Sequence, residues 1–290
     1  MEAARSTQAV KPLGKWMKLN LLLGSALPFL AGLSLFVGTT QTDETSAWTI
    51  DSAITAATIG GAYWAGFFLT FLSGLERVWA RARTAIPPVF AFTVLNTIST
   101  IIEWDRFHTD SDSFGTLLVT YLWLIPYALG PILLIGLWIY QERLPGGDPP
   151  RQAPISGALR AVLAVQGLIL AGVGIALFIA PLDVAGEIWP WELTPLTGRV
   201  IAAWLIGLAV GVACVLREND WARSRPAAVS YMFFGLLEIV ALLRYSDDVD
   251  FDSARTLLYL AFMASVLVVG AYTTWASSRG DRREPSPATT

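Results

Sequence analysis

The sequence has few of the side chains that bind cofactors, metals or nucleotides. It contains one cysteine, Cys214, and one histidine, His108, and its three lysines all precede residue 19. A retinal Schiff base needs a lysine within the membrane, and haem or zinc sites need several histidines or cysteines. The chain also has no phosphate-binding loop. We therefore expect no catalytic cluster, no cofactor, no metal site and no binding of nucleic acid.

Charged residues are scarce as well, at 15% of the chain, whereas 54% is hydrophobic and the mean hydropathy is +0.54. In soluble domains about a quarter of the residues are charged. A helix that crosses a bilayer needs roughly 20 apolar residues, and eight stretches qualify. These stretches are 19–38, 52–75, 86–102, 114–140, 161–182, 200–216, 227–243 and 256–275. The sequence thus predicts an all-α, polytopic membrane helix bundle of about eight transmembrane helices in a lipid bilayer.

The basic residues between these stretches predict the orientation of the chain. Lysine and arginine are retained on the cytoplasmic side during insertion. Of the 20 basic residues, all but Arg106, Arg199, Arg244 and Arg255 fall in the two terminal segments and in alternate loops. We therefore expect a multi-pass protein of the cell (plasma) membrane with both termini in the cytoplasm. The excess of arginine over lysine is typical of a GC-rich bacterial genome.

An internal similarity predicts a duplication. A shift of 142 residues aligns segment 76–83, ERVWARAR, with segment 218–225, ENDWARSR. Each half contains four predicted helices, so two tandem four-helix repeats would lie in parallel orientation, related by an axis along the membrane normal. The predicted segments are a cytoplasmic leader (1–18), a first repeat (19–140), a cytoplasmic linker (141–156), a second repeat (157–276) and a disordered cytoplasmic tail (277–290).

Glu238 is the residue that most suggests a function, because it is ionisable and lies within a predicted transmembrane helix. A charge at that depth costs a few kcal/mol unless it is paired, protonated or hydrated. The aligned residue in the first repeat is Asn96, and the two could face each other as a proton- or cation-binding centre. The alternative is a structural ion pair of Glu238 with Arg244, Arg199 or Arg255.

The predicted outer loop at 189–199 reads WPWELTPLTGR and includes Trp189, Trp191 and Arg199. Tryptophan prefers the headgroup boundary, so this loop is either an aromatic anchor at the membrane surface or a lid over a ligand. The loop resembles that of bacterial multi-pass membrane proteins with a Trp-Pro-Trp segment followed by Leu-Thr-Pro-Leu-Thr. That resemblance implies a membrane protein and no particular activity.

Three functions stay open at this point. The chain could be a small transporter or ligand-binding membrane protein, with a small molecule between the repeats and a polar centre at Glu238 and Asn96. It could instead be a scaffold or accessory subunit that docks a partner membrane protein, or an enzyme that acts on lipids through acids of the outer loops. Transporters often interrupt paired helices with proline, but Pro126 and Pro131 in 114–140 have no counterpart in 256–275.

Overall fold

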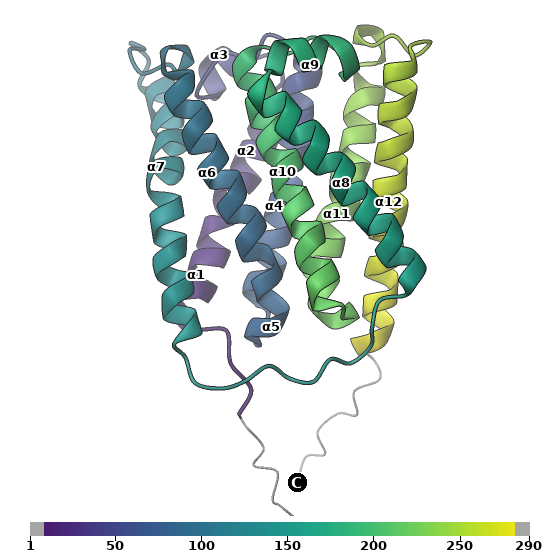
Figure 1. The fold of residues 1–290 in the computed structure, drawn as a ribbon. Coiled ribbons are helices and arrows are strands. Elements are labelled where there is room, and N and C mark those ends of the chain that lie inside the picture. Colours follow the sequence, from purple (N-terminus) through teal and green to yellow (C-terminus); the bar gives the residue numbers. More distant parts are fainter. Residues whose placement is uncertain (1–8, 282–290) are drawn as a thin grey trace, which may run out of the picture.

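The computed structural model describes residues 9–281, which form a bundle of long helices joined by short loops (Figure 1). Eight spans within this part of the chain are long and apolar enough to cross a membrane, which confirms the predicted fold class. The spans are α1 (Lys15–Gly24) with α2 (Ala26–Val37), α4 (Ala53–Leu75), α5 (Trp79–Ala82) with η1 (Arg83–Ala85) and α6 (Ile86–Ile102), α7 (Phe114–Glu142), α8 (Gly157–Ile179), α10 (Pro195–Glu218), α11 (Trp221–Arg244) and α12 (Ala254–Asp281).

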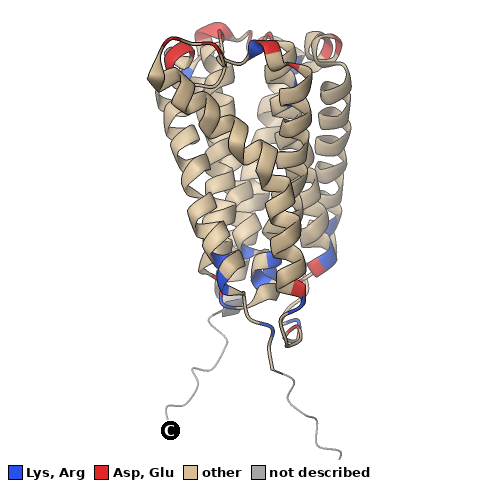
Figure 2. Cartoon of the chain, turned by 90° about the vertical axis from the view of Figure 1, so that its left-hand side faces the viewer, with Lys and Arg blue, Asp and Glu red and all other residues tan. Residues whose placement is uncertain are grey.

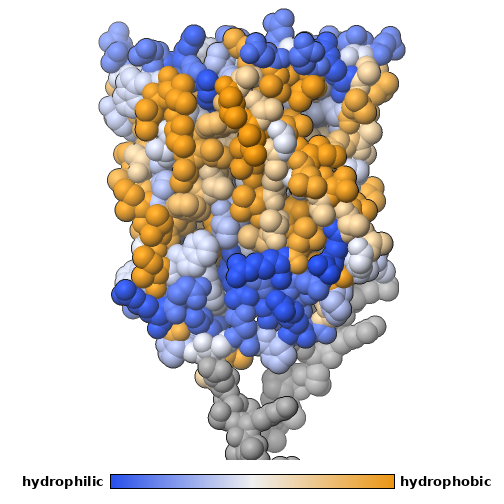
Figure 3. All heavy atoms as spheres, viewed as in Figure 1, coloured by the Kyte–Doolittle hydropathy of each residue, from blue (hydrophilic) through white to orange (hydrophobic). Residues whose placement is uncertain are grey.

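Short helices connect the spans at one end of the bundle. They are α3 (Thr42–Thr45), η2 (Trp104–Arg106), α9 (Pro181–Ile188) and η3 (Ser246–Asp248). We call this the acidic end, because most of its charged residues are aspartate and glutamate, as Figure 2 shows. The opposite end, where α1 begins and α12 ends, is the basic end. A broad apolar band separates the two on the surface (Figure 3), as expected for a protein in contact with lipid.

Several helices begin earlier than the apolar stretches predicted. Span seven begins at Trp221 instead of 227, because Asp220 accepts a hydrogen bond from the Arg223 amide at 3.1 Å and caps a polar first turn. Such caps satisfy the free amides of a first turn. At the other end, α12 continues to Asp281, so 277–281 of the predicted disordered tail is helical, and the rest of that tail lies outside the described residues.

The first span is not one continuous helix, because it is interrupted at Ser25 between α1 and α2. Pro28 explains the break, since a proline has no amide hydrogen and its ring clashes with the carbonyl four residues earlier, here that of Gly24. The hydroxyl of Ser25 donates to the Leu22 carbonyl at 2.7 Å. This bend lies beside the cavity described below.

Four helices form the centre of the bundle and four surround them. The central helices are α4, α6, α10 and α11, with α4 against α11 and α6 against α10. Around them, α2 lies on α4, α12 on α11, α8 on α10 and α7 on α6. The chain therefore forms a ring in the order α2, α4, α11, α12, α8, α10, α6, α7.

A cluster of ion pairs holds the basic end together. The Arg83 guanidinium donates to both carboxylate oxygens of Glu218, at 2.7 and 2.8 Å, and Arg223 donates to the same carboxylate at 2.8 Å. Asp148, in the segment between α7 and α8, accepts from both arginines. Asp220 accepts from the amides of that segment as well. The cluster thus joins the first four spans to the last four.

Candidate functional site

The largest internal space is a cavity of about 870 Å³ between the first four spans and the central helices α10 and α11. It extends from Ser224 and Thr273 near the basic end to Thr45 and Ala47 at the acidic end. Small-molecule sites usually measure about 300–1,000 Å³. The space is therefore large enough for a sizeable ligand, and it runs along most of the length of the helices.

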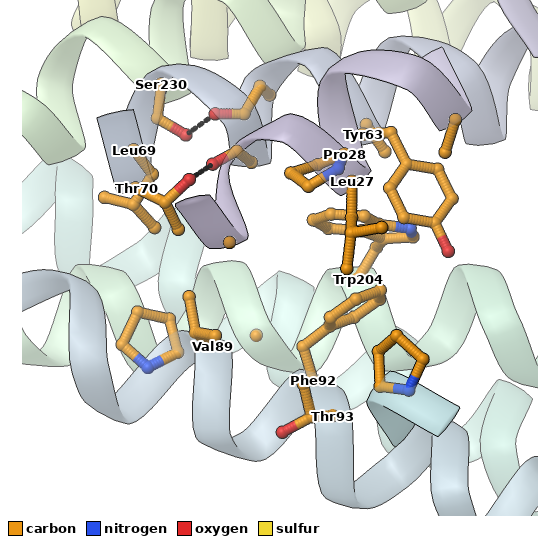
Figure 4. Close-up of a pocket in the computed structure, with 18 of the residues that line it drawn as sticks. Leu27, Pro28, Tyr63, Leu69, Thr70, Val89, Phe92, Thr93, Trp204 and Ser230 are labelled. Atoms are coloured by element: carbon orange, nitrogen blue, oxygen red, sulfur yellow. Dashed lines mark hydrogen bonds between the residues drawn. The ribbon is translucent and has the colours of Figure 1, made fainter. Parts of the chain in front are cut away.

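The walls of this cavity are mainly aliphatic and aromatic, and Glu44 is the one charged residue that lines it within 9–281. In Figure 4, Leu27, Phe92 and Trp204 come from three different helices and converge on the same space. Two of the polar lining groups are satisfied elsewhere: Ser230 donates to the Ala65 carbonyl at 2.8 Å and Thr70 to that of Gly66 at 2.9 Å. The cavity is thus suited to an apolar occupant.

The cavity opens sideways between α2 and α7. Its lining includes Leu30 of α2 and Leu122, Leu129 and Leu133 of α7, which are also exposed on the outer surface of the bundle. Near its ends α7 is held by α1 at the basic end and by α3 at the acidic end, and the opening lies between these contacts. In a membrane this opening would face the lipid chains.

The proline residues of α7 shape this opening. Pro131 cannot donate to the Tyr127 carbonyl, and the Thr97 hydroxyl of α6 donates to it instead. By contrast, α12 lies so close to α11 that an added Cβ at Gly235 would come within 2.6 Å of the Leu267 amide nitrogen. Bent α7 and straight α12 thus cover their neighbours differently, which agrees with the proline asymmetry noted in the sequence.

Two tyrosines contribute the strongest polar feature of the cavity wall. The hydroxyls of Tyr63 on α4 and Tyr127 on α7 are 2.7 Å apart, and both side chains are buried. The ring of Trp204 lies between this pair and Phe92, with ring centroids 5.1 Å from Tyr63 and 3.9 Å from Phe92. The sequence analysis did not select these residues, because nothing in a single sequence indicates that hydroxyls on two separate helices meet.

Glu238 lies outside this cavity, in a small void between α4, α10, α11 and α12. Only 1% of its surface is exposed, and its Oε2 accepts a hydrogen bond from the Tyr259 hydroxyl at 2.8 Å. It precedes the last residue of α11, Arg244, by six positions, so it lies about 9 Å from the acidic end of that helix. The polar centre that the sequence suggested is thus nearer one surface than the middle of the bundle.

The structure does not bring Asn96 together with Glu238. The Asn96 amide donates to the Phe92 carbonyl of its own helix at 2.9 Å, and its Oδ1 has no partner among the described residues. Asn96 is not among the residues that line the void beside Glu238. The two aligned residues therefore occupy separate places, α6 against α10 and α11 against α4.

The arginines proposed as counter-charges of Glu238 have other partners. Arg199 forms an ion pair with Glu103, Arg244 donates to the carbonyls of Phe36 and Val37, and Arg255 donates to that of Gly186. No ion pair of Glu238 is found among the described residues. The alternative of a structural ion pair therefore has no support in this geometry.

The tryptophans of the 189–199 loop turn inwards instead of reaching for the membrane surface. Trp189 and Trp191 are 5% and 9% exposed, and both rings lie against Tyr259, with centroids 5.4 and 5.5 Å away. The Trp191 indole donates to the Thr55 hydroxyl at 2.9 Å. Of the two interpretations of this loop, a cover fits the geometry and a surface anchor does not.

No protein-family model, no curated protein and no solved structure matches the chain. The resemblance of the 189–199 loop to bacterial membrane proteins stays a prediction. Within the described part of the chain, no group of three or more His, Cys, Asp or Glu residues could hold a metal ion. The function must therefore come from the cavity and from the void beside Glu238.

Proposed function

We propose that this protein binds an apolar, membrane-dissolved molecule with a long chain, such as a lipid or an isoprenoid, in the cavity between α2 and α7. The observation that carries the proposal is a space of about 870 Å³ with almost wholly apolar walls and a lateral opening. A water-filled path would need polar walls, because unpaired polar contacts in hydrocarbon are costly. An acyl or isoprenoid chain enters from the bilayer without leaving an apolar environment.

The tyrosine pair supports binding of a molecule with a small polar group. A hydroxyl that already takes part in the bond between Tyr63 and Tyr127 keeps one acceptor or donor position free. A hydroxyl, carbonyl or carboxyl group of the ligand would find its partner there. This position replaces the Glu238 and Asn96 centre as the polar part of the ligand site.

We also propose that the chain arose by duplication and that both termini face the cytoplasm. The Trp79 amide donates to the Lys11 carbonyl at 3.1 Å, and the Trp221 amide donates to that of Ala153 at 3.2 Å. Both members of the second bond lie 142 residues after those of the first, as do the first residues of α10 and α4. An experimental structure whose two halves do not superpose would contradict the duplication, and labelling of a cysteine in the 146–151 linker from each side of the membrane would test the orientation.

A pair of glycine variants tests the ligand site. Gly130 lines the cavity, and an added Cβ there has 3.9 Å to its nearest neighbour, Thr93. A leucine side chain at 130 would fill part of the cavity, whereas Gly136, on the same helix, faces open space away from the cavity. We expect Gly130→Leu to weaken binding of a fluorescent polyene fatty acid about tenfold in lipid nanodiscs, since overfilling a packed space costs about 1–3 kcal/mol.

The control variant Gly136→Leu should bind the probe as the wild type does. Energy transfer from the protein's tryptophans to the polyene measures binding above the background of the bilayer. If both variants and the wild type give the same signal, the probe stays in the lipid around the protein and the proposal fails.

A further inference from the structure

The void beside Glu238 combines a small volume with an unusual number of unpaired polar atoms. It measures about 10 Å³. Four buried atoms without a hydrogen-bond partner among the described residues belong to side chains that line it: Glu238 Oε1, Thr58 Oγ1, Trp189 Nε1 and Trp204 Nε1. Each such group left unpaired costs about 1–3 kcal/mol. A cluster of four around one void is therefore a site that lacks its ligand.

The chemistry of these four atoms selects the kind of ligand. The indole nitrogens of Trp189 and Trp204 can only donate, a glutamate oxygen accepts when ionised, and the Thr58 hydroxyl does either. A metal cation would be repelled by the two N–H donors, and an anion by an ionised carboxyl group. An apolar group would leave all four atoms unpaired. A neutral molecule that both donates and accepts satisfies the whole set.

The size of the void narrows the ligand further. A water molecule needs about 10–15 Å³ of such space and two to four polar partners, which is what this void offers. The Thr58 hydroxyl lies close to the Glu238 carboxyl and the Tyr259 hydroxyl without hydrogen-bond geometry to either. A bridging water would connect these groups.

We propose that the void is a hydration site, in which one water molecule bridges Glu238 to Thr58 and the indoles of Trp189 and Trp204. Together with the bond from Tyr259, this water gives both carboxyl oxygens of Glu238 a partner. The buried tryptophans of the 189–199 loop cover the site from the acidic end. Trp204, Ala62 and Phe234 line both this void and the large cavity, so they form the wall between the hydration site and the apolar site.

An experimental structure of the full chain in lipid, at a resolution that shows ordered water, tests the proposal. We expect one peak at about 3 Å from Glu238 Oε1 and from at least one of the other three atoms. In Glu238→Gln, which keeps an acceptor oxygen, the peak should stay. In Thr58→Ile, whose longer side chain fills the void, it should be lost.

An empty void in the wild type would overturn the proposal, and so would a peak with the short, multiple oxygen contacts of a cation. Infrared spectroscopy keeps the test decisive if Thr58→Ile does not fold. The carboxyl band that Glu238→Gln removes should have the position of a group hydrogen-bonded at both oxygens and should respond to exchange into heavy water. A band at the position of a singly bonded carboxyl would contradict a bridging water.

Discussion

At the scale of single residues, Arg83 shows how the two halves of the chain are held together. Its guanidinium binds Glu218 through two hydrogen bonds and also contacts Asp148. Glu218 is nearly buried, so the loss of a charged partner leaves part of its carboxylate unsatisfied. The same pairing means that Arg83 and Arg223 are already engaged and are not spare cations for lipid headgroups.

We predict that Arg83→Ala lowers the free energy of unfolding by about 2 kcal/mol, the usual effect of removing a hydrogen bond to a charged group. The nearby exposed residue Arg77 provides a control, since surface substitutions usually change stability by less than about 0.5 kcal/mol. Thermal unfolding in one detergent compares the variants. Equal melting of Arg83→Ala and Arg77→Ala would show that the cluster adds nothing to stability.

The residue scale is also where the sequence was least informative. The sequence identified Glu238 as a buried ionisable group, because a single acid stands out in an apolar helix. It could not identify Tyr259 as its partner or the tryptophans as its cover, since these come from other elements. The Glu238 and Asn96 pairing failed because equal positions in two aligned helices lie side by side only when both helices line the same axis.

At the scale of elements, the contrast between α7 and α12 accounts for the cavity. An added Cβ at Gly270 of α12 would lie 2.4 Å from the Met232 amide nitrogen of α11. Gly130 is the aligned residue of α7, and there the nearest atom is 3.9 Å away. The second half is thus closed by a tight glycine contact where the first half has an open space.

We predict opposite effects of the same substitution at these two glycines. Gly270→Ala should destabilise the protein by about 1–3 kcal/mol, because backbone atoms must move apart. Gly130→Ala should be neutral or slightly stabilising, since alanine is favoured over glycine in a helix by about 0.5–1 kcal/mol. Thermal melting of the two variants in the same detergent measures the difference. A loss of stability in Gly130→Ala would mean that α7 lies closer to α6 than described here.

Most elements could be predicted from the sequence, but their ends could not. Apolar stretches located all eight spans because lipid contact requires them. The spans begin earlier where a polar first turn is capped, as at Asp220, and hydropathy does not register such turns. Pro126 and Pro131 were visible in the sequence, but the opening beside them depends on how α7 is held at both ends.

At the scale of the whole molecule, the alternation of basic and acidic loops fixed the topology before the structure was known. The cavity has no comparable signal, because its walls come from apolar residues that look the same as those of any membrane helix. Their exposure is decided by how the helices meet. The central claim, an apolar ligand inside the bundle, therefore has to be tested by locating a ligand.

The most direct test is cross-linking with a fatty acid that carries a photoactivatable group in its chain, followed by mass spectrometric mapping of the labelled residues in the wild-type protein. We predict labels on the inner wall, at Leu69, Phe92 or Thr93, which line the cavity and are at most partly exposed. Labels confined to outward-facing residues such as Leu168 and Leu258 would show that the probe only surrounds the protein, and would contradict the account.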